Sequence, residues 1–175
     1  RKGVGIFLLN KENKLWVGKR IDFKSNFWQM PQGGIDKNET PRQAMVRELG
    51  EEVGVTKNFK IIDETKKWLD YQLPNELKQR VWKGKFVGQK QKWFLCKFLG
   101  MDKEIDLGTH KPEFCEWKWI EPSEATKLVV PFKKKMYENI MLINSNIPKK
   151  NNLLVLFISY NKRDKMMFFI QYKIK

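Results

Sequence analysis

The chain has 175 residues, of which 41% are hydrophobic and 31% are charged, a composition that excludes a disordered polypeptide and favours one domain with its own core. The formal net charge of +15 disfavours basic substrates and favours a polyanionic partner. Lysine supplies 29 of the 35 basic residues, however, and an AT-rich genome also produces this bias. Charge alone therefore leaves both interpretations open.

Cysteine and histidine usage argues against several kinds of site. Cys96 and Cys115 do not have the CxxC spacing of a zinc knuckle or a disulfide framework, and they fit a reducing cytoplasm. The single histidine, His110, has no second histidine with which to share a metal, and we interpret it as a loop residue. No segment reaches the roughly 18 to 20 apolar residues of a membrane span, so we expect no membrane partner.

The first third of the chain predicts a hairpin followed by a turn. Residues 4–9 and 15–17 are apolar runs on either side of a polar segment, which is typical of two strands joined by a loop. The segment 28–32 follows, and the Pro and Gly residues of 31–34 form a breaker cluster that we expect to stop a strand.

A helix is predicted over residues 41–53. Thr40 is a suitable N-cap, Pro41 suits the first helical position, Gln43 completes a capping box and Gly54 suits a left-handed terminator. Apolar side chains recur every four residues and predict one stripe toward a core: Met45, Leu49 and Val53.

Later segments predict a mixed sheet and a last helix. Strands are expected at 60–62, 68–73, 93–99 and 116–120. Pro131 precedes an amphipathic helix whose expected stripe is Phe132, Met136, Ile140 and Ile143.

The character of the chain changes from about Asn144, where Asn and Lys cluster around apolar runs at 153–158 and 166–170. These runs fit either two additional strands or an appended sequence. We therefore expect one domain over residues 1–144 and a tail over 145–175.

Three glutamates of the predicted helix, Glu48, Glu51 and Glu52, stand at i, i+3 and i+4, which places them on one side of the helix. They lie toward its C-terminus, where the helix dipole disfavours each negative charge by about 0.3 to 1 kcal/mol. A solvated acidic face is one interpretation, but a bound cation accounts better for this position. Because the ligands are all oxygens, the pattern favours Mg²⁺ or Mn²⁺ together with substrate phosphates.

The segment before the helix also fits phosphate chemistry. Gly33 and Gly34 have no side chains that would hold a phosphate chain or a metal away from the backbone. Glu39 and Arg47 are spaced so that the guanidinium can hold the carboxylate through two hydrogen bonds and fix the loop against the helix.

Together these residues resemble a complete Nudix box, GX5EX7REUXEEXGU. The matching positions are Gly33, Glu39, Arg47, Glu48, Leu49, Glu51, Glu52, Gly54 and Val55. The resemblance implies an α/β (α+β) fold, the Nudix α/β/α sandwich with a mixed β-sheet. It also implies metal-dependent hydrolysis of a diphosphate linked to another group, with Mg²⁺ or Mn²⁺ as cofactor.

Segments 28–35, 88–94 and 112–114 resemble the bacterial RNA pyrophosphohydrolases, also called dinucleoside polyphosphate hydrolases. The likeness runs from Arg1 to about Met141. It implies an enzyme that removes pyrophosphate from the 5′-triphosphate end of RNA, leaves a 5′-monophosphate and so initiates mRNA decay. It further implies a cytoplasmic monomer without DNA specificity.

The resemblance also implies roles for individual positions. The expected catalytic residues are Glu48, Glu51, Glu52 and Glu113, the first three of them metal ligands. The expected phosphate-binding residues are Arg1, Arg20, Gly34 and Lys133, and the expected base-binding residues are Val130 and Phe132. Phe132 also fits simple packing, and Lys90 and Lys92 fit either a solvated strand edge or phosphate contacts.

Two other functions remain open at this point. The first is a hydrolase of dinucleoside polyphosphates, such as diadenosine tetraphosphate, in the nucleotide pool. The second is a non-catalytic RNA-binding module with the same fold, which the intact acidic positions disfavour.

Overall fold

An eight-stranded mixed sheet forms the centre of the structure. The structure is a computed structural model, and it describes residues 1–22, 26–79, 81–109, 111–145, 155–161 and 166–172. Its main path runs β3 (Trp28–Gln29), β2 (Leu15–Arg20), β1 (Lys2–Leu9), β7 (Gly88–Phe98) and β5 (Phe59–Glu64). Three more strands pair with this path: β4 (Gln32–Gly34) with β1, β6 (Leu69–Gln72) with β7, and β8 (Phe114–Ile120) with β2. β1 and β7 are parallel and the other pairs are antiparallel, which confirms the predicted mixed sheet.

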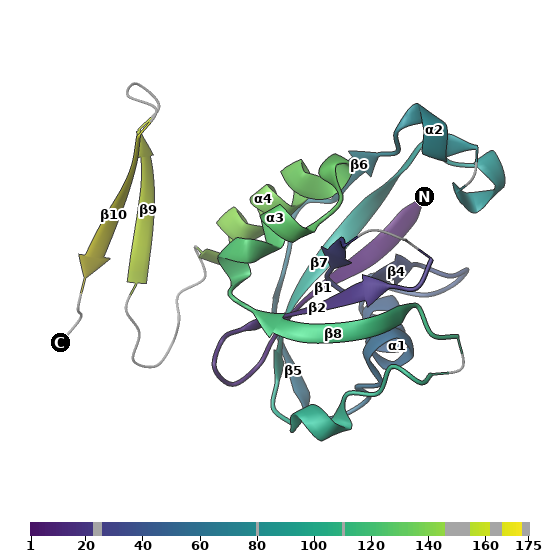
Figure 1. Cartoon of the computed structure of the whole chain (residues 1–175), viewed down its shortest axis with the longest axis horizontal. Coiled ribbons are helices and arrows are strands. Elements are labelled where there is room, and N and C mark those ends of the chain that lie inside the picture. The colour runs from purple at the N-terminus through teal and green to yellow at the C-terminus, as the bar shows by residue number, and fades with distance from the viewer. Residues whose placement is uncertain (23–25, 80, 110, 146–154, 162–165, 173–175) are drawn as a thin grey trace.

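Helices lie on both faces of the sheet (Figure 1), which confirms the predicted α/β/α sandwich. The helices are α1 (Pro41–Val53), α2 (Asn75–Lys78), α3 (Ala125–Leu128) and α4 (Lys134–Ser145). Short 3₁₀ segments occur at Val81–Gly84, Asp102–Glu104, Pro122–Glu124 and Pro131–Lys133. The two four-residue helices, α2 and α3, and the 3₁₀ segments are too short to show a hydrophobic period, so they could not be predicted from the sequence. No helix in the described ranges is long and apolar enough to cross a membrane.

Alternation along β1 divides the core into two halves. Val4, Ile6 and Leu8 are fully buried on the face that packs against α1, and Phe7 is buried on the opposite face with α4. Because β1 is central and covered on both sides, its sequence is an almost continuous apolar run.

The helix α1 begins and ends at the predicted residues. The Thr40 hydroxyl accepts a hydrogen bond from the Gln43 N–H at 3.3 Å, and the Gln43 side chain accepts one from the Thr40 N–H at 2.9 Å. Gly54 has a φ of 75°, and its N–H donates to the Gly50 carbonyl at 3.1 Å. The side chains of the predicted stripe are all fully buried.

The strand before the predicted breaker cluster does stop, because β3 ends at Gln29, ahead of Pro31. The cluster itself was not expected to pair, yet Gln32–Gly34 form β4, in which Gly33 pairs with Val4 and Gly34 with Gly3. A side chain on Gly3 would overlap the Gly33 carbonyl, so the glycines permit a close backbone approach rather than a break.

The last helix and β7 differ in part from expectation. Met136 and Ile140 are buried as predicted, but Ile143, near the end of α4, is 36% exposed. β7 begins at Gly88 rather than Trp93. It is paired on both sides, with Lys90 opposite Lys2 of β1 and Asp70 of β6, so Lys90 does not lie on a strand edge.

The tail contains two strands, β9 (Val155–Asn161) and β10 (Met166–Tyr172), which pair antiparallel with each other in a second sheet. The apolar runs of the tail therefore form strands, as one of the two interpretations predicted, and these strands lie in a sheet of their own. Residues 153–154 of the first run, and His110, lie outside the described residues.

Substitution of Gly54 by Ala should lower the free energy of unfolding by about 2 kcal/mol, because a left-handed φ is strained for alanine. The new Cβ would also lie 2.6 Å from the Asp106 carbonyl oxygen. Urea unfolding measures the effect. Gly50→Ala, in the same helix, is the control, since its Cβ meets only the Thr56 methyl at 3.3 Å. Equal stability of the Gly54→Ala variant and the parent would contradict this account.

Candidate active site

A cavity of about 310 Å³ brings together predicted residues from both ends of the domain. Its lining includes Arg1, Arg20, Gly33, Gly34, Glu48, Glu51, Glu113, Val130, Phe132 and Lys133. A second cavity of about 330 Å³ is lined by Glu52 and again by Glu48, Glu51 and Glu113. Acidic side chains therefore form a boundary shared by the two cavities, which we call the acidic ridge: Glu48, Glu51 and Glu113.

Arg47 ties the loop before α1 to the acidic ridge. Its Nε and Nη2 atoms donate to the two carboxylate oxygens of Glu39, each at 2.9 Å, which is the predicted two-bond arrangement. Nη2 also donates to the Gly34 carbonyl at 2.8 Å. Nη1 donates to Glu48 at 2.9 Å and to Glu51 at 2.8 Å. Hydrogen bonding to this guanidinium lowers the pKa of Glu39.

Glu48 and Glu52 are acidic side chains in a buried position. Removal from water raises the pKa of Glu52 well above its usual value, and the neighbouring charges of Glu113 and Glu48 raise it further. Burial is also the main reason that the pKa of Glu48 is raised. Glu52 Oε2 accepts a hydrogen bond from the Gln32 N–H at 2.7 Å. In the part of the chain that the structure describes, Glu52 Oε1 is buried without a hydrogen-bond partner.

The donor set fits a hard divalent cation. An unpartnered buried carboxylate oxygen and raised carboxyl pKa values both mark a place where positive charge is missing. Within the described ranges, however, no three Asp, Glu, His or Cys side chains converge closely enough to hold a metal ion. The contacts of Arg47 explain this, because they draw Glu48 and Glu51 toward the guanidinium.

Gly33 and the adjacent Gly34 make room for side chains of the site. A Cβ on Gly33 would overlap the Glu48 carboxyl group, and a Cβ on Gly34 would overlap the Arg1 guanidinium. The sequence suggests that these glycines leave room for phosphate or metal at the backbone. In the structure they also admit one acidic and one basic side chain into the cavity.

Arg20 lies between two carboxylates at the wall of the first cavity. It donates to Asp22 through Nε at 2.7 Å and Nη2 at 2.8 Å, and to Glu113 through Nη1 at 2.5 Å. The hydrogen bonds with Arg20 lower the pKa of Asp22. Arg20 thus holds Glu113 in the acidic ridge although Glu113 lies on the loop before β8.

Lys133 is a buried amine that lines the same cavity, with only 5% of its surface exposed. Its Nζ donates to the side-chain oxygens of Gln29 at 3.0 Å and Gln32 at 3.1 Å. Burial lowers the pKa of Lys133 to about 7, and the charge of Arg20 acts in the same direction. The adjacent Phe132 ring is half-buried and lies 5.7 Å from the Tyr71 ring.

Several lining residues were missed by the sequence analysis. Tyr71 and Gln89 form part of the lining, and the Tyr71 hydroxyl donates to the Gln89 side chain at 2.9 Å. Gln29, Gln32 and Gln89 stand in segments already noted for their resemblance, which was the available signal. Tyr71 had no such signal, because only the pairing of β6 with β7 brings it to the cavity.

Sequence comparisons relate most of the chain to characterised families. The family model described as NUDIX domain matches residues 1–140. A Pelagibacter ubique protein named RNA pyrophosphohydrolase is 53% identical over 140 residues, covering 80% of this chain and 88% of the relative. A Rickettsia bellii protein of the same name is 48% identical, covering 81% of this chain and 87% of the relative.

Structure comparisons find the same fold in more distant proteins. The Escherichia coli dihydroneopterin triphosphate pyrophosphohydrolase aligns with a TM-score of 0.63 at 20% identity, covering 82% of this chain and 95% of that chain. A Caenorhabditis elegans Ap4A hydrolase aligns with a TM-score of 0.60 at 23% identity, covering 83% and 98%. At these identities the comparison establishes the fold alone.

Replacement of Lys133 by Met should change how stability depends on pH. Because the pKa of Lys133 is about 7 when folded and 10.5 when exposed, the unfolded chain binds a proton between these values that the folded chain lacks. The free energy of unfolding of the parent should therefore rise with pH, relative to the variant, through this window. Urea titrations of both proteins near the two ends of the window measure the difference. A difference that stays constant would contradict a neutral folded Lys133.

Proposed function

This chain belongs to the Nudix family, and from that premise we propose that it removes pyrophosphate from the 5′-triphosphate end of RNA and leaves a 5′-monophosphate. The observation that carries the proposal is the meeting of an acidic ridge with Arg1, Arg20 and Lys133 around one cavity. The identity of about half of the aligned residues with proteins named RNA pyrophosphohydrolase supports RNA as the substrate.

Nudix hydrolases are generally dependent on divalent metal ions. We propose that Glu48, Glu51 and Glu52 hold Mg²⁺ or Mn²⁺, which would neutralise phosphate oxygens and activate water. Arg1 and Arg20 contribute fixed positive charge where the triphosphate binds, and Gly34 allows the Arg1 guanidinium to approach. The Lys133 amine, whose pKa is about 7, would take up a proton when the polyanion binds beside it. Phosphoryl transfer depends chiefly on such positioning and charge.

Proton transfer requires a carboxylate that is not committed to the cation. Glu113 is our candidate, because it lines both cavities and lies outside α1. Its Oε2 accepts a hydrogen bond from Arg20, which fixes the position of the Glu113 carboxylate within the acidic ridge. On this proposal a Glu113 oxygen takes the proton of the attacking water.

The nucleoside at the 5′ end needs an apolar surface near the phosphate site. Phe132 and Val130 line the cavity beside Lys133, and Tyr71 lies against Phe132. We propose that a base stacks on Phe132, since aromatic faces bind bases of single-stranded RNA.

The two other functions are less well supported. The Ap4A hydrolase likeness concerns the fold alone and does not favour a dinucleotide substrate. A non-catalytic module would not need Glu48, Glu51, Glu52 and Glu113 gathered at two adjoining cavities.

The cellular location and the oligomeric state of the protein are also part of the proposal. We propose a cytoplasmic monomer without DNA specificity or membrane partner. Cys96 and Cys115 are both free thiols, which fits a reducing compartment.

The Glu52→Gln variant should lose about two to three orders of magnitude in turnover, because a neutral amide cannot replace a carboxylate that stabilises the reaction. The assay offers triphosphorylated RNA and diadenosine tetraphosphate together with Mg²⁺ and follows both products. Glu138→Gln, on the exposed side of α4, is the matched control. Cleavage of the dinucleotide alone would refute RNA as the preferred substrate, and a near-parental rate would remove Glu52 from the site.

We also propose that residues 1–144 are the hydrolase domain and that the tail is dispensable for turnover. The family model ends at residue 140, and β9 and β10 pair with each other rather than with the main sheet. A chain truncated before Ser145 should therefore keep parental kcat and KM. Loss of turnover in a truncated chain that still unfolds cooperatively would contradict this division.

A further inference from the structure

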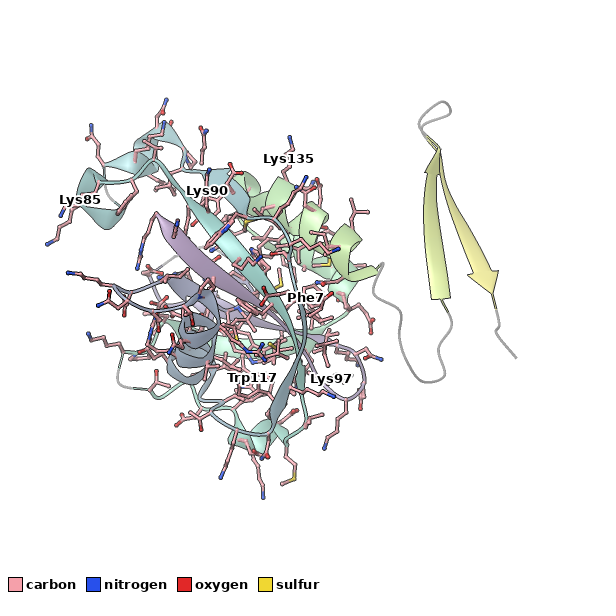
Figure 2. The ribbon with its side chains drawn as sticks, turned by 180° about the vertical axis from the view of Figure 1, so that it is seen from behind. Phe7, Lys85, Lys90, Lys97, Trp117 and Lys135 are labelled. Carbon is pink, nitrogen blue, oxygen red and sulfur yellow. The ribbon has the colours of Figure 1, made fainter. Side chains whose placement is uncertain are left out.

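A basic groove adjoins the 310 Å³ cavity, which we call the catalytic cavity, at the N-terminal ends of β1 and β7. The groove has a volume of about 500 Å³, and its lining includes Arg1, Lys2, Lys85, Phe86, Lys90 and Asp70. We call it the downstream groove. Figure 2 shows Lys85 and Lys90 at one end of the molecule, with Lys97 at the other end of β7.

The downstream groove is continuous with the catalytic cavity. Arg1, Tyr71 and Gln89 line both. Tyr71 lies between the Phe132 ring, 5.7 Å away on the cavity side, and the groove residues that follow on β6. A chain that places its first nucleotide in the cavity can therefore leave along the groove without crossing the acidic ridge.

The charge of the groove complements a polyanion. Four of the lining residues that the structure describes are cationic, Arg1, Lys2, Lys85 and Lys90, against the single acid Asp70. Lys2, Lys90 and Asp70 stand opposite one another on three adjacent strands, so the sheet fixes the spacing of the Lys2 and Lys90 backbones. All three lysines are exposed to solvent.

Aromatic side chains accompany these cations. Phe86 lines the groove and is 40% exposed, and Trp68 is 36% exposed with Lys2 Nζ 5.6 Å from its ring centroid. A cationic track with exposed aromatic rings is typical of proteins that bind single-stranded nucleic acid, because phosphates pair with the charges and bases stack on the rings. The rings distinguish this groove from a site for a small inorganic anion.

We propose that the downstream groove binds the single-stranded RNA that follows the 5′-terminal nucleotides of the substrate. This inference rests on the proposed function and extends it, because it assigns part of the net positive charge to the body of the transcript. Recognition would depend on the RNA backbone and on stacking, and would be independent of sequence.

Substrates of two lengths test the proposal: a triphosphorylated dinucleotide and a triphosphorylated oligonucleotide of about twelve nucleotides, which is long enough to fill the groove. The test variant is Lys85→Glu/Lys90→Glu. The matched control is Lys57→Glu/Lys60→Glu, which makes the same change in charge beside β5, where Lys60 pairs with Lys97 at the far end of β7. All four lysines are exposed, and thermal unfolding checks that both variants fold.

The test variant should raise the KM of the longer RNA about tenfold relative to the control, with kcat and the KM of the dinucleotide unchanged. Phe86→Ala should raise the same KM about tenfold through lost stacking. An unchanged KM for the longer RNA, or an equal rise for both lengths, would overturn the proposal. An acidic protein partner, for example, would leave the KM of both RNAs unchanged.

A binding measurement separates this proposal from the proposed function. Anisotropy of a labelled 5′-monophosphorylated RNA of the same length reports on the groove without turnover. Loss of two phosphate contacts should reduce the slope of log affinity against log salt concentration by about 1.4. If the parent cleaves neither RNA, the proposed function fails, and equal binding by parent and test variant then overturns the groove as well.

Discussion

The contacts of one guanidinium hold the candidate site together. Arg47 binds Glu39 with two nitrogens, holds the Gly34 carbonyl and neutralises part of the charge of Glu48 and Glu51. Without it, Glu39 and the Gly34 carbonyl would lose these hydrogen bonds to α1, and the charges of Glu48 and Glu51 would lose their shared cationic partner. A lysine at this position has a single charged nitrogen and cannot reproduce the fork.

Local signals made α1 and its box predictable from sequence. Thr40, Gln43 and Gly54 act within one or two turns of the helix that they delimit, so their effects can be read from neighbouring residues. Gly33 and Gly34 show the limit of such reasoning. Their positions were informative, but the reason for them lies in Glu48 and Arg1, which approach from other parts of the chain.

Most of the missed features depend on pairing between distant segments. The sequence shows Lys90 as a polar residue before an apolar run, but only the positions of β1 and β6 make it part of a central strand. The burial of Lys133 could not be predicted either, because lysine side chains are mostly exposed. Its hydrogen-bond partners, Gln29 and Gln32, are distant in sequence. Tertiary contacts, rather than residue type, decide the state of these groups.

The parallel pairing of β1 with β7 also has a consequence for folding. β1 pairs with β7, which follows α1, β5 and β6 in the chain, so the centre of the sheet forms only when a long loop closes. Arg1 and Gln89 lie beside the paired ends of these two strands and line the cavity. Their part of the cavity wall therefore depends on this long-range pairing, whereas Arg47 and Glu39 meet through contacts that are local in the chain.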